Sequence, residues 1–279
     1  MSAGRAGRVE EITAHSNPRI KAIRALSQKK HRDREGLFVA EGLKHANDAL
    51  AAGWTIATLV HSKAALADEK LRGKVEQVSA TIRARGGDVL IVPDRLLSAI
   101  SRRDNPLAVL SVIESRTADL SELPADNAVW LALDRVRDPG NLGTCFRTAE
   151  ALGIAAIVLV GDTTDPFALE TVRATMGAFF HIPFARMNEA EFAELASRWQ
   201  EKGGHVTGTH LAGSSDFRAL DYSEGPQLVV MGNEQAGLSP QMADACDRLA
   251  RIPMSGEADS MNLAVATGIM LFETRRHAL

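Results

Sequence analysis

The chain has 279 residues, of which 45% are hydrophobic and 24% are charged, and its formal net charge at pH 7 is −3. This composition is typical of a globular protein with a sizeable core, and the net charge argues against a general affinity for nucleic acid. The cysteines, Cys145 and Cys246, exclude a disulfide framework, and the histidines show no metal-ligand spacing, so we expect no metal. No apolar run approaches the roughly 20 residues of a membrane span. We therefore expect a cytoplasmic protein that makes no membrane contact.

Positive charge is concentrated near the N-terminus. Residues 1–34 contain nine Lys or Arg against three Asp or Glu, a net charge of +6, so the rest of the chain carries −9. A basic arm on an acidic body is typical of proteins that bind a phosphate backbone, although a solvated helix face has the same composition. The candidate phosphate contacts are Lys21, Arg24, Lys29, Lys30, Arg32 and Arg34.

Strand and helix patterns alternate over the first 114 residues. Asn17 and Pro18 predict the start of a helix that reaches about Gln28, and a charged turn is expected over residues 29–36. Strands are then predicted over residues 37–42, 54–60, 88–92 and 107–113, and helices over 43–51, 64–85 and 94–100. The alternation predicts a small α/β domain over residues 1–114.

Residues 115–127 are polar and predict a linker to a second domain over residues 128–279. Strands are predicted there over residues 128–133, 155–160, 182–186, 205–209, 227–231 and 250–254, and helices over 142–152, 169–180, 189–201, 240–249 and 263–272. This series indicates a mostly parallel sheet covered on both faces, whose ligands bind at the carboxyl ends of the strands.

The final helix, over residues 263–272, contains no charged residue and is expected to be buried. Ser260 is its predicted N-cap, so Ser260 and Asn262 would lie beside the free N–H groups of the helix. A polar ligand could be held at this point. The alternative for this segment alone is a capped core helix.

Three loops of the second domain carry unusual polar residues, over residues 134–143, 232–240 and 252–262. Together they could bring five side chains to a common cleft: Asn141, Arg147, Glu234, Ser260 and Asn262. The loops lack the lysine of a phosphate-binding loop, the Gly-x-Gly-x-x-Gly of a dinucleotide site and the Gly-x-Ser-x-Gly of a hydrolase. The sequence therefore indicates a glycine-turn ligand pocket without a metal or covalent nucleophile.

At these loops the chain resembles the SpoU or TrmH family of RNA ribose 2′-O-methyltransferases, of the SPOUT class. Residues 138–149 match a motif Asp-Pro-x-Asn-x-Gly-x-x-x-Arg-x-Ala, residues 232–239 match Gly-x-Glu-x-x-Gly-Leu-Ser, and residues 252–272 match Ile-Pro-Met-x-Gly followed by Ser-x-Asn and an apolar helix. Two departures are Thr175, where Ser is usual, and Met261, where Leu is common. Residues 18–50 resemble the small substrate-binding domain found before many SpoU domains, whose fold is similar to ribosomal RNA-binding proteins.

The resemblance implies a trefoil-knotted α/β sheet, a homodimer with its active site at the interface, and S-adenosylmethionine as cofactor. Gly232, Ile252 and Met261 are then expected to contact the cofactor. Further residues expected nearby are Thr209, Leu211, Met231, Met254 and Leu263.

The resemblance also implies that Arg147 is the catalytic arginine. Because an arginine is a poor base at neutral pH, we expect it to position the substrate phosphate and to stabilise charge, with the phosphate as one candidate proton acceptor. Asn141, Glu234, Ser260 and Asn262 are expected to orient Arg147, the ribose and the cofactor.

The sequence favours ribosomal RNA as substrate, because a separate N-terminal domain is present. Transfer RNA is the alternative substrate, since enzymes on both RNAs share all three motifs. Two other classes remain open, a catalytically silent RNA-binding relative and a nucleotide-dependent oxidoreductase. The retained polar set argues against the first, and the missing glycine fingerprint argues against the second.

Overall fold

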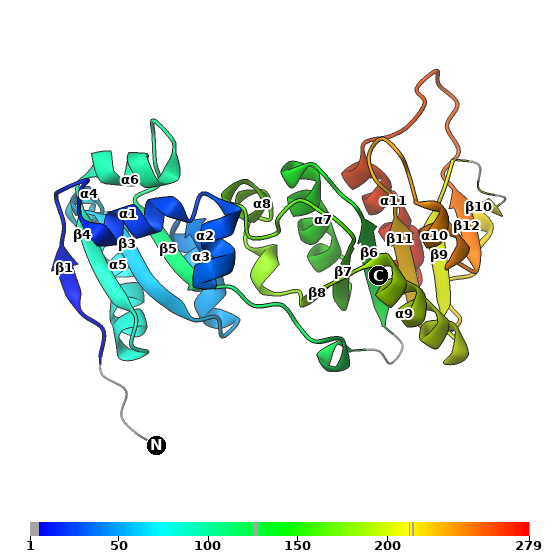
Figure 1. The fold of residues 1–279 in the computed structure, drawn as a ribbon, viewed down its shortest axis with the longest axis horizontal. Helices are drawn as coiled ribbons and strands as arrows, with labels where there is room; N and C mark the ends of the chain where they lie inside the picture. The colour runs from blue at the N-terminus through cyan, green and yellow to red at the C-terminus, as the bar shows by residue number, and fades with distance from the viewer. Residues whose placement is uncertain (1–5, 125–127, 212, 214, 279) are drawn as a thin grey trace. The chain divides into compact units, whose positions relative to one another are not determined.

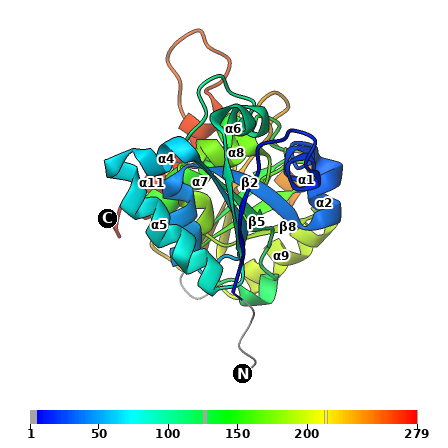
Figure 2. The same ribbon diagram turned by 90° about the vertical axis from the view of Figure 1, so that its left-hand side faces the viewer.

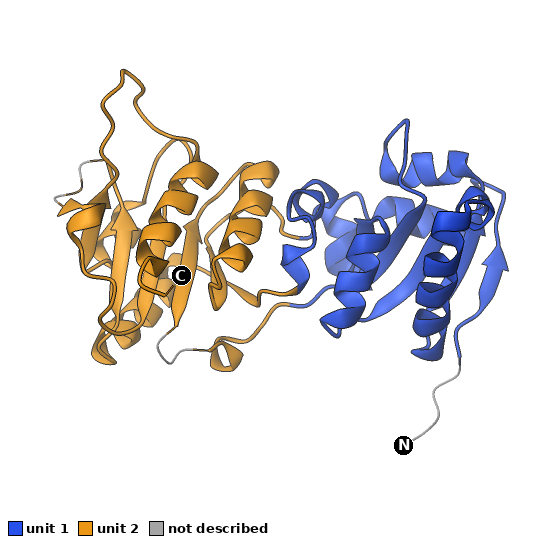
Figure 3. Ribbon diagram, turned by 180° about the vertical axis from the view of Figure 1, so that it is seen from behind, with its two compact units in different colours: residues 1–116, 167–180 blue, residues 117–166, 181–279 orange. Residues whose placement is uncertain are grey.

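Two separate β-sheets organise the structure, a computed structural model that describes residues 6–124, 128–211, 213 and 215–278 (Figure 1). One sheet has five strands in the order β1-β4-β3-β5-β2, and the other has seven in the order β10-β12-β9-β11-β6-β7-β8. Each sheet belongs to one compact unit (Figure 3). Unit 1 contains Met1–Arg116 and Phe167–Phe180, and unit 2 contains Thr117–Pro166 and His181–Leu279.

The sheet of unit 1 confirms the predicted α/β pattern. Its strands are β1 (Val9–Glu11), β2 (Leu37–Glu41), β3 (Ile56–Ser62), β4 (Asp88–Val92) and β5 (Val109–Glu114), of which β5 is antiparallel to both neighbours. Its helices up to this point are α1 (Pro18–Ala25), α2 (Lys29–Glu35), α3 (Leu43–Ala51), α4 (Lys63–Ala67), α5 (Glu69–Ala84) and α6 (Asp94–Ser101). Apolar side chains of α1 and α6 form a core on one face of this sheet. Helix α5 lies on the opposite face (Figure 2).

Several predictions for this unit need correction. The single helix predicted over residues 64–85 forms two helices, α4 and α5, which are separated at Asp68. The charged stretch 29–36, predicted as a turn, forms α2, which ends at Gly36 in a left-handed conformation with φ 63°. The helix predicted to reach Gln28 ends at Ala25. Because α2 has almost no apolar side chain, its sequence lacks the periodic signal on which helix prediction depends.

A segment of chain from the second half completes unit 1. Helix α8 (Leu169–Ala174) and the short 3-10 helix η2 (Ala178–Phe180) follow Phe167. Phe167 packs on Phe38 with ring centroids 5.1 Å apart, and the indole N–H of Trp54 donates to the carbonyl of Phe180 at 3.1 Å. One continuous helix was predicted over residues 169–180, and this is wrong because Met176 and Gly177 both have positive φ.

A buried ion pair joins α8 to β2 within unit 1. The Arg173 guanidinium donates to both carboxylate oxygens of Glu41, at 2.6 and 2.7 Å, and also to the carbonyl of Ser101 at 2.7 Å. The Glu41 side chain is only 2% exposed. The pair ties α8 to β2, because the Glu41 carboxylate is shielded from water and depends mainly on Arg173 for its hydrogen bonds.

The sheet of unit 2 is parallel in every strand pair, as the sequence predicted. Its strands are β6 (Val129–Asp134), β7 (Ala156–Val160), β8 (Phe184–Met187), β9 (His205–Thr209), β10 (Ser215–Asp216), β11 (Gln227–Met231) and β12 (Arg248–Arg251). Its helices are α7 (Pro139–Ala151), α9 (Glu189–Glu201), α10 (Pro240–Asp244) and α11 (Leu263–Arg275), with short 3-10 turns η1 (Leu120–Glu122) and η3 (Phe217–Ala219). The predicted linker contains η1, and its residues 125–127 lie outside the described part of the chain.

Helices α9 and α10 cover one face of this sheet, and their apolar side chains join alternate strand residues in one core. Helices α7 and α11 pack against each other, and α11 also contacts β11. Thr267 of α11 lies 3.5 Å from the buried thiol of Cys145 on α7. The thiol is inert because burial raises its pKa to about 12.

Three predictions for the end of the chain need correction. The helix predicted over residues 240–249 ends at Asp244, and Arg248–Arg251 forms β12. The N-cap of α11 is Asn262 and not Ser260, since the Asn262 side-chain oxygen accepts from the N–H groups of Ala264 and Val265. Helix α11 is buried on one side only, because Val265 and Phe272 are 54% and 58% exposed. No described helix is long and apolar enough to cross a bilayer.

Candidate active site

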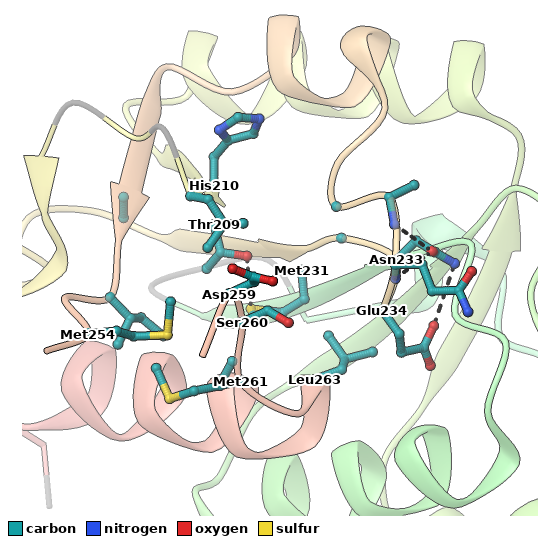
Figure 4. A pocket seen from close by; sticks show the side chains of 18 residues that line it. Thr209, His210, Met231, Asn233, Glu234, Met254, Asp259, Ser260, Met261 and Leu263 are labelled. Carbon is teal, nitrogen blue, oxygen red and sulfur yellow. Dashed lines mark hydrogen bonds between the residues drawn. The ribbon is translucent and has the colours of Figure 1, made fainter. Parts of the chain in front are cut away.

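A cavity of about 410 Å³ lies at the carboxyl ends of β9, β11 and β12 (Figure 4). Because these strands are parallel neighbours, the loops that follow them meet at one edge of the sheet. The cavity is lined by all eight residues predicted to hold the cofactor: Thr209, Leu211, Met231, Gly232, Ile252, Met254, Met261 and Leu263. The segments that follow β9, β11 and β12 therefore all contribute side chains to this cavity.

The loop after β11 forms a tight glycine turn along the cavity wall. Asn233 and Gly237 exchange backbone hydrogen bonds of 2.9 and 3.0 Å, and Gly237 has φ +66°. A Cβ atom added to Gly232 would lie 2.3 Å from the backbone of Gly237 and Leu238. Glycine is therefore required at position 232, where the backbone itself forms the wall of the cavity.

The chemistry of the cavity fits S-adenosylmethionine. Met231, Met254, Met261 and Leu263 give it apolar and polarisable walls for an adenine ring and a thioether chain, as Figure 4 shows. Carboxylates line it, whereas no lysine or arginine does so among the described lining residues. An acidic, largely apolar cavity suits a ligand that carries a sulfonium cation on an aromatic nucleoside.

Glu234 joins this cavity to a second pocket of about 650 Å³, because it lines both. One carboxylate oxygen accepts from the Asp138 N–H and from the Asn141 amide, both at 3.2 Å, and the other accepts from the Arg137 N–H at 3.2 Å. Partial burial opposes ionisation of Glu234, but hydrogen bonds from its own N–H and from these groups outweigh that effect and lower its pKa. The carboxylate is thus fixed as an anion.

Three predicted catalytic residues form one hydrogen-bonded chain. Glu234 accepts from the Asn141 amide, and the Asn141 oxygen accepts from the Asn262 amide at 2.9 Å. All three line the second pocket. The chain connects the loop after β11, the first turn of α7 and the N-cap of α11.

The other two predicted catalytic residues lie apart from that chain. Ser260 lines the first cavity. Arg147 is exposed on α7, is absent from the described linings of both pockets, and makes no hydrogen bond or ion pair with the described residues. Within a single chain, the structure therefore does not bring Arg147 into the cavity.

Sequence reasoning missed an ion pair that holds the glycine turn. Asp134, with no exposed surface, accepts from Arg135 at 2.8 and 3.0 Å and from the Ser239 N–H at 3.0 Å. Arg135 also donates to the Gly237 carbonyl at 3.3 Å, and its hydrogen bond to Asp134 raises its pKa. Asp134 itself could have indicated this ion pair, because a carboxylate at the end of a buried strand must find hydrogen-bond or ion-pair partners.

The six side chains predicted to contact phosphate differ in whether they are exposed and free of partners among the described residues. Lys21, Arg24 and Lys30 are exposed, and their side chains form no hydrogen bond or ion pair with the described residues. Lys29 pairs with Asp33 at 2.6 Å, and Arg34 pairs with Glu35 at 2.7 Å. Arg32 is the exception, since it is 7% exposed and donates to the carbonyl of Leu26 at 2.8 Å.

No group of three or more His, Cys, Asp or Glu side chains suited to a metal ion occurs in the described ranges. The site is therefore assembled from amides, carboxylates, a glycine turn and apolar walls. A parallel sheet with such a cavity at its carboxyl edge is the arrangement of a nucleotide-binding α/β enzyme.

Comparison with known proteins gives the family. Residues 128–272 match the model of the SpoU rRNA Methylase family, and residues 17–111 match the MRM3-like substrate binding domain. The chain belongs to the SpoU rRNA methylase family.

Several relatives match along nearly their whole length. An AdoMet-bound rRNA methyltransferase from Sinorhizobium meliloti is 54% identical, with a TM-score of 0.88 over 97% of this chain and 99% of that one. AviRb from Streptomyces viridochromogenes, also solved with AdoMet, is 29% identical, with a TM-score of 0.80 over 94% and 99% of the two chains. The 23S rRNA (guanosine(2553)-2′-O)-methyltransferase RlmP of Bacillus subtilis is 29% identical over 96% of this chain and 100% of its own.

Proposed function

We propose that this protein is an S-adenosylmethionine-dependent methyltransferase that methylates a ribose 2′-hydroxyl of ribosomal RNA. One observation carries the proposal: the residues expected at the cofactor line one cavity, and a Glu234–Asn141–Asn262 chain connects it to a second pocket. Relatives named as 23S rRNA 2′-O-methyltransferases and neighbours solved with AdoMet support it.

We assign the cofactor to the first cavity and the target nucleotide to the second pocket. When bound, S-adenosylmethionine supplies an electrophilic methyl group on a sulfonium. Gly232 lets the backbone approach the cofactor, and Met231, Met261 and Leu263 exclude water from it. Glu234 holds Asn141 and Asn262 in fixed orientations beside the second pocket, where their amides orient the ribose.

We assign Arg147 to the phosphate next to the reacting ribose. Its guanidinium can donate two parallel hydrogen bonds to a phosphate, which places the 2′-hydroxyl and stabilises the charge that develops on its oxygen. Because the guanidinium stays protonated, the substrate phosphate is our candidate for the proton acceptor. Ser260, which lines the cofactor cavity, would orient the ribose or the cofactor.

A homodimer explains two features of the single chain. Arg147 lies exposed on α7, and the neighbouring helix α11 exposes Val265 and Phe272. An apolar helix face of this kind is covered in most proteins. A second copy that covers α11 would bring its own residues close to α7, so that Arg147 acts at an interface.

We assign substrate binding to residues 1–114, through Lys21, Arg24 and Lys30 first, and catalysis to residues 128–279. The match of residues 17–111 to a substrate-binding domain supports this division. We also propose that the last segment of the chain threads a trefoil knot, as the SPOUT resemblance implies. A cytoplasmic location fits the two free cysteines and a ribosomal substrate.

The test is transfer of labelled methyl to total bacterial RNA from a strain that lacks this protein, followed by mapping of ribose methylation. We expect label at one position of ribosomal RNA, and its loss with Arg147→Ala, which should still bind the cofactor. Label in transfer RNA would keep the reaction and overturn the substrate. Absence of cofactor binding by the wild-type protein would overturn the enzyme assignment.

A further inference from the structure

The cofactor cavity is lined by two carboxylates whose surroundings differ. Glu234 already accepts hydrogen bonds from two backbone N–H groups and from the Asn141 amide. Asp259 also lines the cavity, but its carboxylate forms no hydrogen bond or ion pair with the described residues. Figure 4 shows this carboxylate among the side chains that line the cavity, which also include Thr209 and Ser260. Asp259 is thus a negative charge with no partner among the described residues.

The immediate surroundings of Asp259 strengthen its attraction for a cation. The loop that carries it also places Met254 and Met261 along the cavity wall, and no lysine or arginine lines the cavity among the described residues. Asp259 is an exposed residue, so solvent screens much of its charge, and only the apolar walls beside it strengthen its attraction for a cation. The uncharged hydroxyl groups of Thr209 and Ser260 do not neutralise it.

We propose that Asp259 is a specificity-determining residue that supplies the counter-charge for the sulfonium of the methyl donor. S-Adenosylmethionine carries this positive charge, whereas the product S-adenosylhomocysteine is a neutral thioether at the same sulfur. The cavity therefore prefers the donor to the product, and the product is exchanged more readily after each turnover. This inference rests on the proposed function, because it requires the cofactor to occupy the cavity.

The test is calorimetric titration of the full chain with S-adenosylmethionine, S-adenosylhomocysteine and sinefungin. In sinefungin a carbon that bears a protonated amino group replaces the methylated sulfur, so the positive charge is kept. Asp259→Asn removes the charge at nearly constant shape. Glu257→Gln is the matched control, because it removes one negative charge from the same loop at a residue that is not among the described lining residues. Melting temperatures check that each variant is folded.

We expect Asp259→Asn to weaken binding of S-adenosylmethionine about two- to five-fold, the range for one accessible charge pair. The affinity for sinefungin should fall in parallel, and the affinity for S-adenosylhomocysteine should stay within about 1.5-fold of the wild-type value. Glu257→Gln should change the affinity for none of the three ligands. High salt should reduce the difference between wild type and Asp259→Asn.

Three results would overturn the proposal. Equal loss of donor and product affinity would mean that Asp259 contacts a group common to both. An equal loss of donor affinity in Glu257→Gln would mean that the total negative charge of the loop, and not Asp259 in particular, attracts the donor. Unchanged donor affinity in Asp259→Asn would remove the role altogether. If the wild-type protein binds none of the three ligands, the cofactor site itself is wrong, which is a separate and recognisable outcome.

Discussion

Asn262 donates a hydrogen bond of 2.9 Å to Asn141, 121 residues away in the sequence. The Asn262 oxygen caps α11 at the same time, and the Asn141 amide donates to Glu234. Each asparagine therefore uses both ends of its side chain, so neither amide can flip without losing a partner. This fixed chain makes the candidate active site and the start of α11 depend on each other.

Asn262→Ala should lower the free energy of unfolding by about 1–2 kcal/mol, because it removes an N-cap and leaves Asn141 without its donor. Chemical denaturation measures this change. Asn262→Ser, which restores a capping oxygen but cannot span the distance to Asn141, should recover part of the stability. An unchanged midpoint for the alanine variant would mean that the hydrogen bonds contribute nothing net.

The stability contributed by Glu234 should depend on pH. Hydrogen bonds in the folded state lower its pKa below the ordinary 4.5, so its contribution is present above that value and is lost as the pH falls through the folded pKa. The difference in unfolding free energy between wild type and Glu234→Gln should therefore be larger at about pH 7 than at about pH 3. A difference that stays constant or grows toward acid would contradict this sign.

Arg173→Met should destabilise the protein by about 3–5 kcal/mol, because it leaves the buried Glu41 carboxylate without its main partner. Arg103, at 4.0 Å and partly exposed, offers weaker compensation. The double variant Arg173→Met with Glu41→Leu should recover most of the loss, since the unpaired charge is then gone. Equal instability of the single and double variants would show that packing, and not charge, holds α8.

Phe272→Glu should convert the proposed homodimer to a monomer and reduce methyl transfer. The substituted side chain would place a charge on the exposed face of α11, where the wild-type ring is 58% exposed. Light scattering after size-exclusion chromatography measures the change. Val9→Glu, at a 49% exposed residue of β1 in unit 1, is the control and should leave the mass unchanged. A monomeric wild-type protein would reject the dimer.

Some elements with clear local signals were predicted with their correct bounds. Helix α9 and strand β9 are examples, since Asn188 and Glu191 form a capping box that marks the start of α9. Strands β1 and β10 were not predicted, because they are three and two residues long and form only through pairing with β4 and β12. Local sequence does not contain that information.

The grouping of residues around the candidate site could be predicted where a motif names them, but not where contacts between distant segments decide. The residues expected at the cofactor came from the family resemblance, and they line one cavity. The cap of α11 was misassigned to Ser260, because the hydrogen bond from Asn262 to Asn141 that orients the true cap is a tertiary contact. The hydrogen bonds from Arg135 to Asp134 and to the Gly237 carbonyl similarly join two loops that are distant in sequence.

Unit 1 includes a segment from the second half of the chain, and this limits how the two units can be combined with those of relatives. Phe167–Phe180 lies inside the stretch matched by the SpoU model, yet it belongs to unit 1. A fragment that ends at Arg116 would lack Phe180 and Arg173, and would leave the buried Glu41 carboxylate without its main partner. A chimera made by swapping residues 1–116 between relatives would therefore join the core of one protein to residues 167–180 of another. The substrate-binding domain can be transplanted intact only together with residues 167–180.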